Sequence, residues 1–285
     1  MSIPARSRRQ AMEWGLVLAS QEIEAIIDKA EQGWELLVPE GDYGRAQEAL
    51  AQYRAENRNW HWRQPLPEAG LVFHWGSLGW AAAIVAAYYW SAVRFPGVQS
   101  AGIMDSEKVA DGQWWRLLTA VTLHANGPHL MANATTGFVL MGLAMARYGP
   151  GVALLATFLA GVAGNAADML VYAQPHQSLG ASGMVMGALG AITVQSFSFW
   201  RQYRPGGRFL RRAAAAGVLI LVLLGFSPDS DVVAHVGGFI AGAMLGCALG
   251  WVRPARLHGG ALNAGALVAL AALLLAAWRL ALNSP

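Results

Sequence analysis

Charged residues are scarce in this sequence. Only 13% of the 285 residues are Asp, Glu, Lys or Arg, whereas a soluble domain usually carries about 25%. Most of the deficit lies beyond Leu71, because residues 1–68 have an ordinary polar composition. The shortage of charge argues against a protein that is soluble throughout. Together with a hydrophobic content of 55%, it indicates membrane helices in the second part of the chain.

Two further absences narrow the class of protein. Cys247 is the single cysteine, which excludes an internal disulfide. After the basic start MSIPARSRRQ, the apolar run Gly15–Ala19 is shorter than the ~7–15 apolar residues of a signal peptide, so we expect no cleaved leader. The net charge of +3 is small and fits arginine-rich loops, so we expect no nucleic-acid partner.

Residues 1–68 predict a small soluble α+β domain of unassigned role. Short strands are expected in EWGLVLAS, IEAIIDKA and GWELLVP, between residues 12 and 38. A helix is expected from the N-cap Asp42 to about Asn57, with one face formed by Tyr43, Ala46, Leu50 and Tyr53. RQPLPEAG, residues 63–70, is typical of a linker.

Seven long apolar segments follow and predict an all-α polytopic membrane protein with seven transmembrane helices. They lie near 71–93, 127–146, 150–172, 182–200, 211–226, 232–252 and 261–282. The basic residues favour a cytoplasmic N-terminus and an outside C-terminus under the positive-inside rule. These residues are Arg6, Arg8, Arg9, Arg147, Arg201, Arg204, Arg208, Arg211, Arg212, Arg253 and Arg256.

Three polar residues share one depth in this topology. Asn133 precedes Arg147 by 14 residues, about 21 Å of helix. Ser182 precedes Trp200 by 18 residues and His235 precedes Val252 by 17, about 27 and 26 Å. All three therefore fall in the outer half of the bilayer, where polar side chains are functional candidates.

Ser182 and His235 together predict nucleophilic catalysis, because a serine hydroxyl needs a base and histidine commonly provides it. Alone, Ser182 is more simply a helix cap or a packing residue. Glycines give the two segments a way to approach closely in lipid. They recur as Gly183 and Gly187 on the fourth segment and as Gly238, Gly242, Gly246 and Gly250 on the sixth.

Hydrogen-bond donors at the same depth in the membrane come from the stretch HANGPHLMANA, which begins at His124. His129 and Asn133 lie one turn apart on one helix face. With the backbone N–H of Ser182, they are candidate donors to the oxyanion of a tetrahedral intermediate. A structural polar network is the plain alternative. A zinc site from His124, His129 and His235 is the chemical alternative, but HExxH is absent, and we expect no metal.

Asp168 falls near the outer end of the third segment. It is either a third member of a catalytic triad or, as we prefer, a residue that anchors the loop. The sequence thus favours a Ser-His dyad.

Four motifs together resemble the rhomboid intramembrane serine proteases. These are GQWWRLLTAVTLHA (112–125), HANGPHLMAN, GASG around Ser182 and AHVGGFIAG around His235, in the family's order over roughly residues 71–252. The resemblance implies a six-helix core, 69–252, followed by an additional helix, 253–285. It implies Ser182 as nucleophile, His235 as base, His129 and Asn133 at the oxyanion hole, and Trp115 and Arg116 in a loop element. His124, Gly180, Gly183, Gly187, Gly238 and Gly242 would support the site.

The resemblance further implies cleavage of peptide bonds in or near transmembrane segments of substrate proteins, without a cofactor. Met186 departs from the pattern, since many members carry an aromatic residue there. A catalytically inactive rhomboid-like protein that binds membrane clients is the first rival. A transporter is the second, but the sequence lacks paired broken segments. The abundance of Ala, Gly and Arg favours a bacterial inner membrane.

Overall fold

The polypeptide divides into two units, Met1–Glu68 and Ala69–Pro285. The structure, a computed structural model, describes all residues except 31–32, 58–71, 96, 204–206, 227–229 and 285. It gives no side-chain surroundings for 196–203, 207–210 and 213. Of the basic positions predicted between the fourth and fifth apolar segments, Arg204 thus lies outside the described residues, and the side chains of Arg201 and Arg208 are not described.

The first unit contains a three-stranded antiparallel sheet of order β1-β3-β2. Its elements are β1 (Ser2–Ala5), α1 (Arg8–Ser20), β2 (Ile26–Ala30), β3 (Gly33–Leu37), a 3₁₀ turn (Glu40–Asp42) and α2 (Tyr43–Glu56). Leu18 of α1 and Leu50 of α2 are buried with Leu36 of β3, so both helices cover the sheet. Apolar faces meet here because α2 places Ala46 and Leu50 one turn apart.

The strand expected in EWGLVLAS is wrong, because these residues belong to α1. The helix begins where the Ser7 side chain accepts a hydrogen bond from the Gln10 backbone N–H. It then buries Ala11, Trp14 and Leu18, at helical spacing. Asp42 does occupy the N-cap position of α2, but its carboxylate binds Arg45 and caps no backbone N–H.

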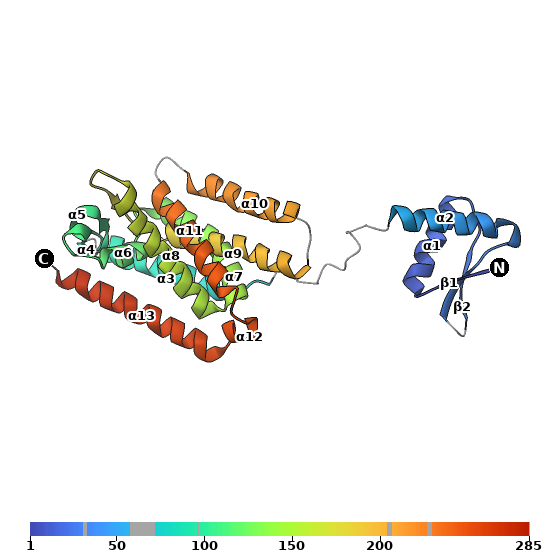
Figure 1. Cartoon of the computed structure of the whole chain (residues 1–285). Coiled ribbons are helices and arrows are strands. Elements are labelled where there is room, and N and C mark those ends of the chain that lie inside the picture. The colour runs from blue at the N-terminus through green and yellow to red at the C-terminus, as the bar shows by residue number, and fades with distance from the viewer. Residues whose placement is uncertain (31–32, 58–71, 96, 204–206, 227–229, 285) are drawn as a thin grey trace. The chain divides into compact units, whose positions relative to one another are not determined.

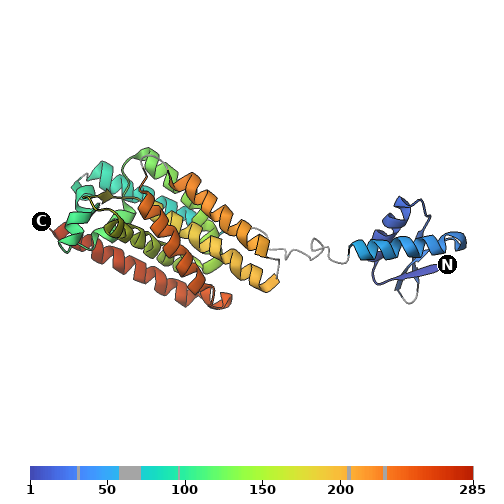
Figure 2. The ribbon, with the colours of Figure 1, turned by 45° about the horizontal axis from the view of Figure 1, so that its top comes forward.

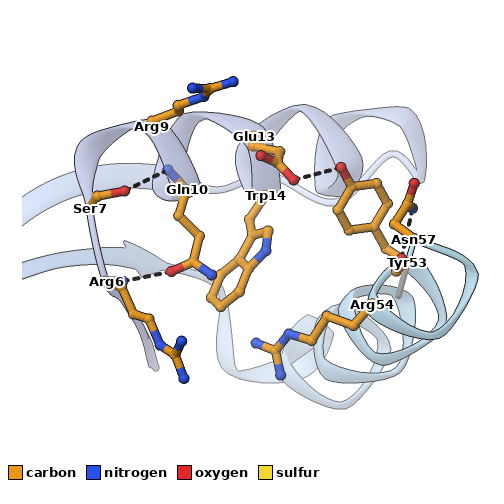
Figure 3. Close-up of a pocket in the computed structure, with 9 residues that line it drawn as sticks. All are labelled: Arg6, Ser7, Arg9, Gln10, Glu13, Trp14, Tyr53, Arg54 and Asn57. Carbon is orange, nitrogen blue, oxygen red and sulfur yellow. Dashed lines mark hydrogen bonds between the residues drawn. The ribbon is translucent and has the colours of Figure 1, made fainter. Parts of the chain in front are cut away.

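A pocket of about 420 Å³ opens between α1 and α2 of this unit (Figure 3). Arg54 extends over the indole of Trp14, with 4.3 Å between its guanidinium carbon and the ring centroid. The carboxylate of Glu13 accepts a hydrogen bond from the Tyr53 hydroxyl at 2.6 Å. Arg6 and Arg9 add to the lining, so it carries three arginines and one glutamate. None of the residues predicted for the catalytic site lies in this unit.

The second unit is a helix bundle, with a helix over each of the seven apolar segments. These helices are α3 (Gly76–Tyr88, continued by the π-helix Tyr89–Arg94), α7 (Gly127–Tyr148), α8 (Pro150–Val171), α9 (Ser182–Tyr203), α10 (Gly207–Gly225), α11 (Val232–Leu249) and α13 (Gly260–Asn283). Among the described residues, α7, α8, α11 and α13 are long and apolar enough to cross a membrane. Shorter apolar stretches lie in α9 and α10. Seven crossings therefore remain a prediction.

Helix α11 packs against both α8 and α9 at the centre of the bundle, with α10 and α13 on opposite edges (Figures 1 and 2). A Cβ atom on Gly238 would overlap the carbonyl of Gly183, and one on Gly242 would overlap the backbone of Gly187. Glycine therefore allows α9 and α11 to touch through their backbones.

The segment between α3 and α7 folds into short elements. These are α4 (Gly97–Gly102), β4 (Met104–Asp105), α5 (Ser106–Ala110), α6 (Arg116–Thr119) and a 3₁₀ turn (Ala120–Thr122). Strand β4 pairs with β5 (Gln177–Ser178), which lies in the connection between α8 and α9. This pairing joins two loops that are far apart in the sequence and both precede helices of the candidate site.

Candidate active site

Ser182 is the first residue of α9 and is partly exposed. The chain turns into this helix at Gly180, whose φ of +142° favours glycine. The Gly180 N–H donates to the carbonyl of Ala120 at 3.0 Å, which ties the turn to the segment before α7. The serine hydroxyl thus stands at the positive end of a helix, on a turn held by a backbone hydrogen bond.

His129 lies beside this serine. The position that a Cβ atom would take on Gly180 is 2.9 Å from Nε2 of His129 and 3.5 Å from Oγ of Ser182. The ring is placed by α7, which begins where the Asn126 side chain accepts the His129 backbone N–H at 2.8 Å. The structure therefore brings two predicted site residues together from different helices.

His235 is buried in the first turn of α11, with 4% of its surface exposed. Its Nδ1–H donates to the carbonyl of Gly225 at 2.7 Å, since a carbonyl oxygen only accepts. This bond leaves Nε2 with the lone pair, which is the form that a general base needs. The described hydrogen bonds of this ring do not include Ser182, so a direct bond between the two is not formed.

The backbones on either side of the pair are nevertheless in contact. A Cβ atom on Gly183 would lie 3.5 Å from the carbonyl oxygen of Ala234. These two residues are the sequence neighbours of Ser182 and His235. The glycine contact between α9 and α11 thus holds the two predicted catalytic residues in adjacent first turns. Met186, one turn after Ser182, is buried in the core of the bundle.

Asn133 follows His129 by one turn of α7 and is only 5% exposed. Its Nδ2 has no hydrogen-bond partner among the described residues. A buried amide N–H without an acceptor is costly, and such groups are found where a ligand or reaction intermediate completes the hydrogen bonding.

Arg116 fixes the loop element that precedes α7. Its side chain, 4% exposed, donates to Gln113 Oε1 at 2.6 Å and to the carbonyls of Ser100 and Ile103 at 3.1 and 2.8 Å. Trp115, the residue before it, is partly buried, and its Nε1 has no partner among the described residues. Arg116 therefore joins α4, the start of β4 and α6 into one support.

His124 is fully buried and stands edge-on to His129, with 5.5 Å between the ring centroids. Burial, followed by the repulsion of His129, lowers the pKa of His124 to about 3, so this ring is neutral. The alternative zinc site from His124, His129 and His235 is not formed, because within the described part of the chain these three do not gather as metal ligands.

Asp168 does not complete a triad. Its carboxylate, near the end of α8, lies with His176 and Asp231, and the Nδ1 of His235 contacts Gly225 instead. Sequence reasoning missed Asp231, which caps α11 by accepting the Ala234 N–H at 3.1 Å. An Asp just before an apolar run is a recognised capping signal. Nothing in the sequence indicated that the carbonyl of Gly225 would accept the hydrogen bond from His235 Nδ1.

Asp231 remains ionised. Burial alone would raise the pKa of this carboxyl, but hydrogen bonds from His176 and from the Ala234 N–H outweigh burial and lower it. The Nε2 of His176 lies 2.8 Å from Asp231 Oδ2. A negative charge therefore sits at the N-terminus of α11, the helix that carries His235.

Comparison with known proteins shows which family this chain resembles. Residues 111–252 match the family model described as "Rhomboid domain". The chain is 34% identical over 175 residues to the rhomboid protease GluP of Bacillus subtilis, covering 60% of this chain and 33% of GluP. It is 30% identical to RHOMBOID-like protein 5 of Arabidopsis thaliana, over 56% of this chain and 53% of that protein. Rhomboid-like protease 3 of Toxoplasma gondii is 31% identical over 140 residues, which are 47% of this chain and 51% of that protein. The matches thus span a third to about half of the relatives' length.

Proposed function

This chain belongs to the rhomboid family, and from that premise we propose that it is an intramembrane serine protease. It hydrolyses peptide bonds in or near the transmembrane segments of other membrane proteins. Ser182 is the nucleophile and His235 the general base. The match to GluP, which is named as a rhomboid protease, supports the activity.

The reaction follows from the two side chains. Ser182 Oγ attacks the scissile carbonyl carbon while Nε2 of His235 accepts the hydroxyl proton. The imidazolium then gives this proton to the leaving amine, and an acyl-enzyme remains. Water, deprotonated by the same nitrogen, then attacks the ester carbon. The bond to Ser182 Oγ breaks, the imidazolium returns the proton to Oγ, and the carboxylic acid product leaves. Throughout, the hydrogen bond from Nδ1 to the Gly225 carbonyl keeps the ring in the required tautomer.

The oxyanion needs donors, and one observation carries the proposal here. The amide Nδ2 of Asn133 is buried without a partner, one turn from His129, whose ring lies beside Ser182. Together with the Ser182 backbone N–H at the start of α9, these groups would supply the donors that the oxyanion needs. A packing role for Ser182 gives no reason for such a set.

The proposed activity also has consequences for the access of substrate and water and for the placement of the chain in the membrane. Water must reach Ser182 at the depth of the membrane, so the site opens to the outer side, and single-span proteins with helix-destabilising small residues are the expected substrates. Residues 69–252 are the protease core and 253–285 an additional helix. Residues 1–68 lie in the cytoplasm, Pro285 lies outside, and the membrane is a bacterial inner membrane. The chemistry of Ser182 and His235 uses no cofactor.

One observation favours a second candidate, an inactive rhomboid-like protein that binds membrane clients. Ser182 and His235 are not hydrogen bonded to each other here. In an active enzyme this bond tightens when substrate binds, since catalytic hydrogen bonds are often long in the free enzyme. A client-binding protein would have no such requirement.

Labelling with a fluorophosphonate separates the two candidates. The purified protein in detergent should be labelled at Ser182 and should cleave a transmembrane reporter substrate. Ser182→Ala and His235→Ala should each abolish cleavage, and Ser182→Ala should abolish labelling. Ser91→Ala is a matched control, because this buried hydroxyl donates to Ala87 within its own helix. An unlabelled, inactive wild type that still retains membrane clients would establish the binding protein instead.

Orientation is tested separately. A reporter that works only in the cytoplasm should be active when fused at Gly206 and silent when fused after Pro285. The opposite pattern would refute both the topology and the outward-facing site.

A further inference from the structure

Three metal-ligating side chains meet beside the candidate active site. Asp168 comes from the last turn of α8, His176 from the connection between α8 and α9, and Asp231 from the N-cap of α11. One ligand atom from each lies within 4.8 Å of the others. Within the described residues no other group of three or more such side chains gathers in this way.

Asp168 is the unusual member of this cluster. Its residue surface is 1% exposed, and neither carboxylate oxygen has a hydrogen-bond partner among the described residues. A buried carboxylate without donors is costly, because no hydrogen bond replaces the hydration that it has lost. One of its oxygens lies within 4.8 Å of an oxygen of Asp231, and this second carboxylate increases the cost. The arrangement therefore lacks a positive group between the two carboxylates.

The other two side chains are held in place. The His176 backbone N–H donates to Ser106 Oγ at 2.9 Å, and its carbonyl accepts the Ser106 N–H at 3.0 Å. The ring of Tyr172 stacks on the His176 imidazole, with 4.1 Å between centroids. Asp231 is fixed by its capping bond to the Ala234 N–H. Ligands held by surrounding contacts of this kind are typical of metal sites.

We propose that Asp168, His176 and Asp231 bind one divalent cation of the Zn²⁺ or Mn²⁺ class. Two carboxylates with one imidazole suit such cations, whereas Mg²⁺ and Ca²⁺ prefer oxygen ligands alone. A charge of +2 between two carboxylates neutralises the cluster and gives Asp168 the partner that it lacks. Ligand atoms around tetrahedral zinc are roughly 3.3 Å apart, so small side-chain rotations suffice from the present separations of up to 4.8 Å. This site differs from the excluded zinc alternative at His124, His129 and His235.

The cation would join three elements at one point. These are the end of α8, the loop before Ser182 and the first turn of α11. His235 is one turn from the site, since its backbone N–H donates to the carbonyl of Asp231 at 3.0 Å. The cation stabilises the junction on which the base is mounted, without itself taking part in peptide cleavage. The site does not depend on the proposed activity.

Metal binding and thermal melting test the site without any measurement of proteolysis. The full chain is purified with an affinity tag free of histidine, stripped with EDTA and freed of the chelator. Equilibrium dialysis against Zn²⁺ or Mn²⁺ should give one bound ion per chain, and the ion should raise Tm. Mg²⁺ at the same concentration should have little effect on Tm.

Asp168→Asn and His176→Gln should each lose the bound ion and the rise in Tm. Two matched variants should keep both: Asp111→Asn, an exposed aspartate, and His258→Gln, an exposed histidine. Absence of a bound ion in the wild type would overturn the proposal. So would an undiminished ion in both cluster variants, which would place the metal elsewhere.

A proton shared between Asp168 and Asp231 is the alternative way to reduce the cost of burying the Asp168 carboxylate. The variant Asp168→Asn distinguishes this shared proton from a bound cation. An asparagine amide can donate to Asp231 as a protonated carboxyl would, so this variant would then match or exceed the wild-type Tm with no response to metal in either protein. That result would refute the cation. If Asp168→Asn does not fold, the partly exposed His176→Gln decides alone, because its loss of the ion supports the site and its retention overturns it.

Discussion

The imidazole of His129 occupies the space that a side chain on Gly180 would need. A Cβ atom there would lie 2.8 Å from Cε1 and 2.9 Å from Nε2 of the ring. Gly180 also has a φ of +142°, which L residues with side chains rarely adopt. The residue two positions before the proposed nucleophile is thus required to be glycine for two reasons, one of backbone conformation and one of contact with His129, the proposed oxyanion donor.

Gly180→Ala should therefore strongly reduce proteolysis. The added methyl group displaces the His129 ring from the side of Ser182. An error of about 1 Å near reacting groups can cost ~10²-fold in rate. Backbone strain at a positive φ should lower stability as well, by about 1–3 kcal/mol. The measurement is kcat per folded molecule on a transmembrane substrate, with folding checked by thermal melting.

Gly112→Ala is the matched control for strain alone. Gly112 has a φ of +98°, and a Cβ atom there would meet nothing within 4 Å. This variant should lose stability but keep its kcat. If the two variants lose activity equally, the effect at Gly180 comes from strain in the fold and the placement of His129 is not the cause.

Asn133→Ala should lower kcat by roughly 10²–10³-fold, as loss of an oxyanion donor does in other enzymes. KM should change much less, because the amide contacts charge that develops only in the transition state. Its Nδ2 has no partner to lose among the described residues, so Tm should fall little. Steady-state kinetics and thermal melting on the same preparation check both parts.

Asn165→Ala is the matched control, because it removes a buried asparagine whose amide does have a hydrogen-bond partner. This asparagine is equally buried, at 4% exposed, but its Nδ2 donates to the Leu117 carbonyl at 2.8 Å. Its replacement leaves a buried carbonyl unpaired, which costs about 1–3 kcal/mol. Tm should fall clearly. A change in KM alone for Asn133→Ala would move that residue from the oxyanion to substrate binding.

The sequence predicted the helices of the bundle well, because each apolar segment is long and the chain around it is polar. It failed at α1, where EWGLVLAS was expected to be a strand. The apolar residues in this eight-residue stretch fit both the spacing of a helix and the alternation of a strand. The residue that favours the helix is the N-cap Ser7, which lies outside the stretch.

Candidate site residues could be named from the sequence where polar residues share a depth in the membrane and a motif. Ser182, His129 and Asn133 stand out as polar groups in apolar helices. The Gly225 carbonyl could not be foreseen, because every residue has a carbonyl and only the packed chain shows which one meets His235. The meeting of Asp168, His176 and Asp231 was equally hidden, since it depends on how the α8–α9 connection folds.

Stability should fall as the pH drops below about 6.5. Burial lowers the pKa of His124 to about 3, whereas an unfolded histidine has a pKa near 6.5. Between these values the unfolded chain binds the extra proton, so the contribution of neutral His124 is present above pH 6.5 and is lost as the pH falls. The slope from this one group is at most about 1.4 kcal/mol per pH unit.

Replacing His124 with Phe isolates that contribution. Thermal melting between pH 7.5 and pH 5 should show a smaller decline in Tm for His124→Phe than for the wild type. Equal slopes for wild type and His124→Phe would mean that His124 becomes protonated without unfolding the chain.

Gly242→Leu should damage both packing and catalysis. A Cβ atom on Gly242 would already overlap the backbone of Gly187, so a leucine forces α9 and α11 apart or rotates them. Overpacking of this kind typically costs about 1–3 kcal/mol. Gly242 lies seven residues after His235, about 10 Å along the helix. The displacement should therefore reach the contact between Gly183 and Ala234 that holds Ser182 near His235.

Gly250→Leu distinguishes a general effect of a large residue from damage at this contact. Gly250 continues the four-residue spacing of Gly238, Gly242 and Gly246, but a Cβ atom there would meet only carbonyls of its own helix, at 3.2 and 3.3 Å. It also lies 15 residues from His235, about 22 Å. Specific activity per folded molecule should thus fall by ~10²-fold for Gly242→Leu and little for Gly250→Leu. Full activity of Gly242→Leu would show that the close approach of α9 and α11 does not position Ser182 and His235. The most crowded point between the two backbones would then tolerate a leucine without moving the serine away from the histidine.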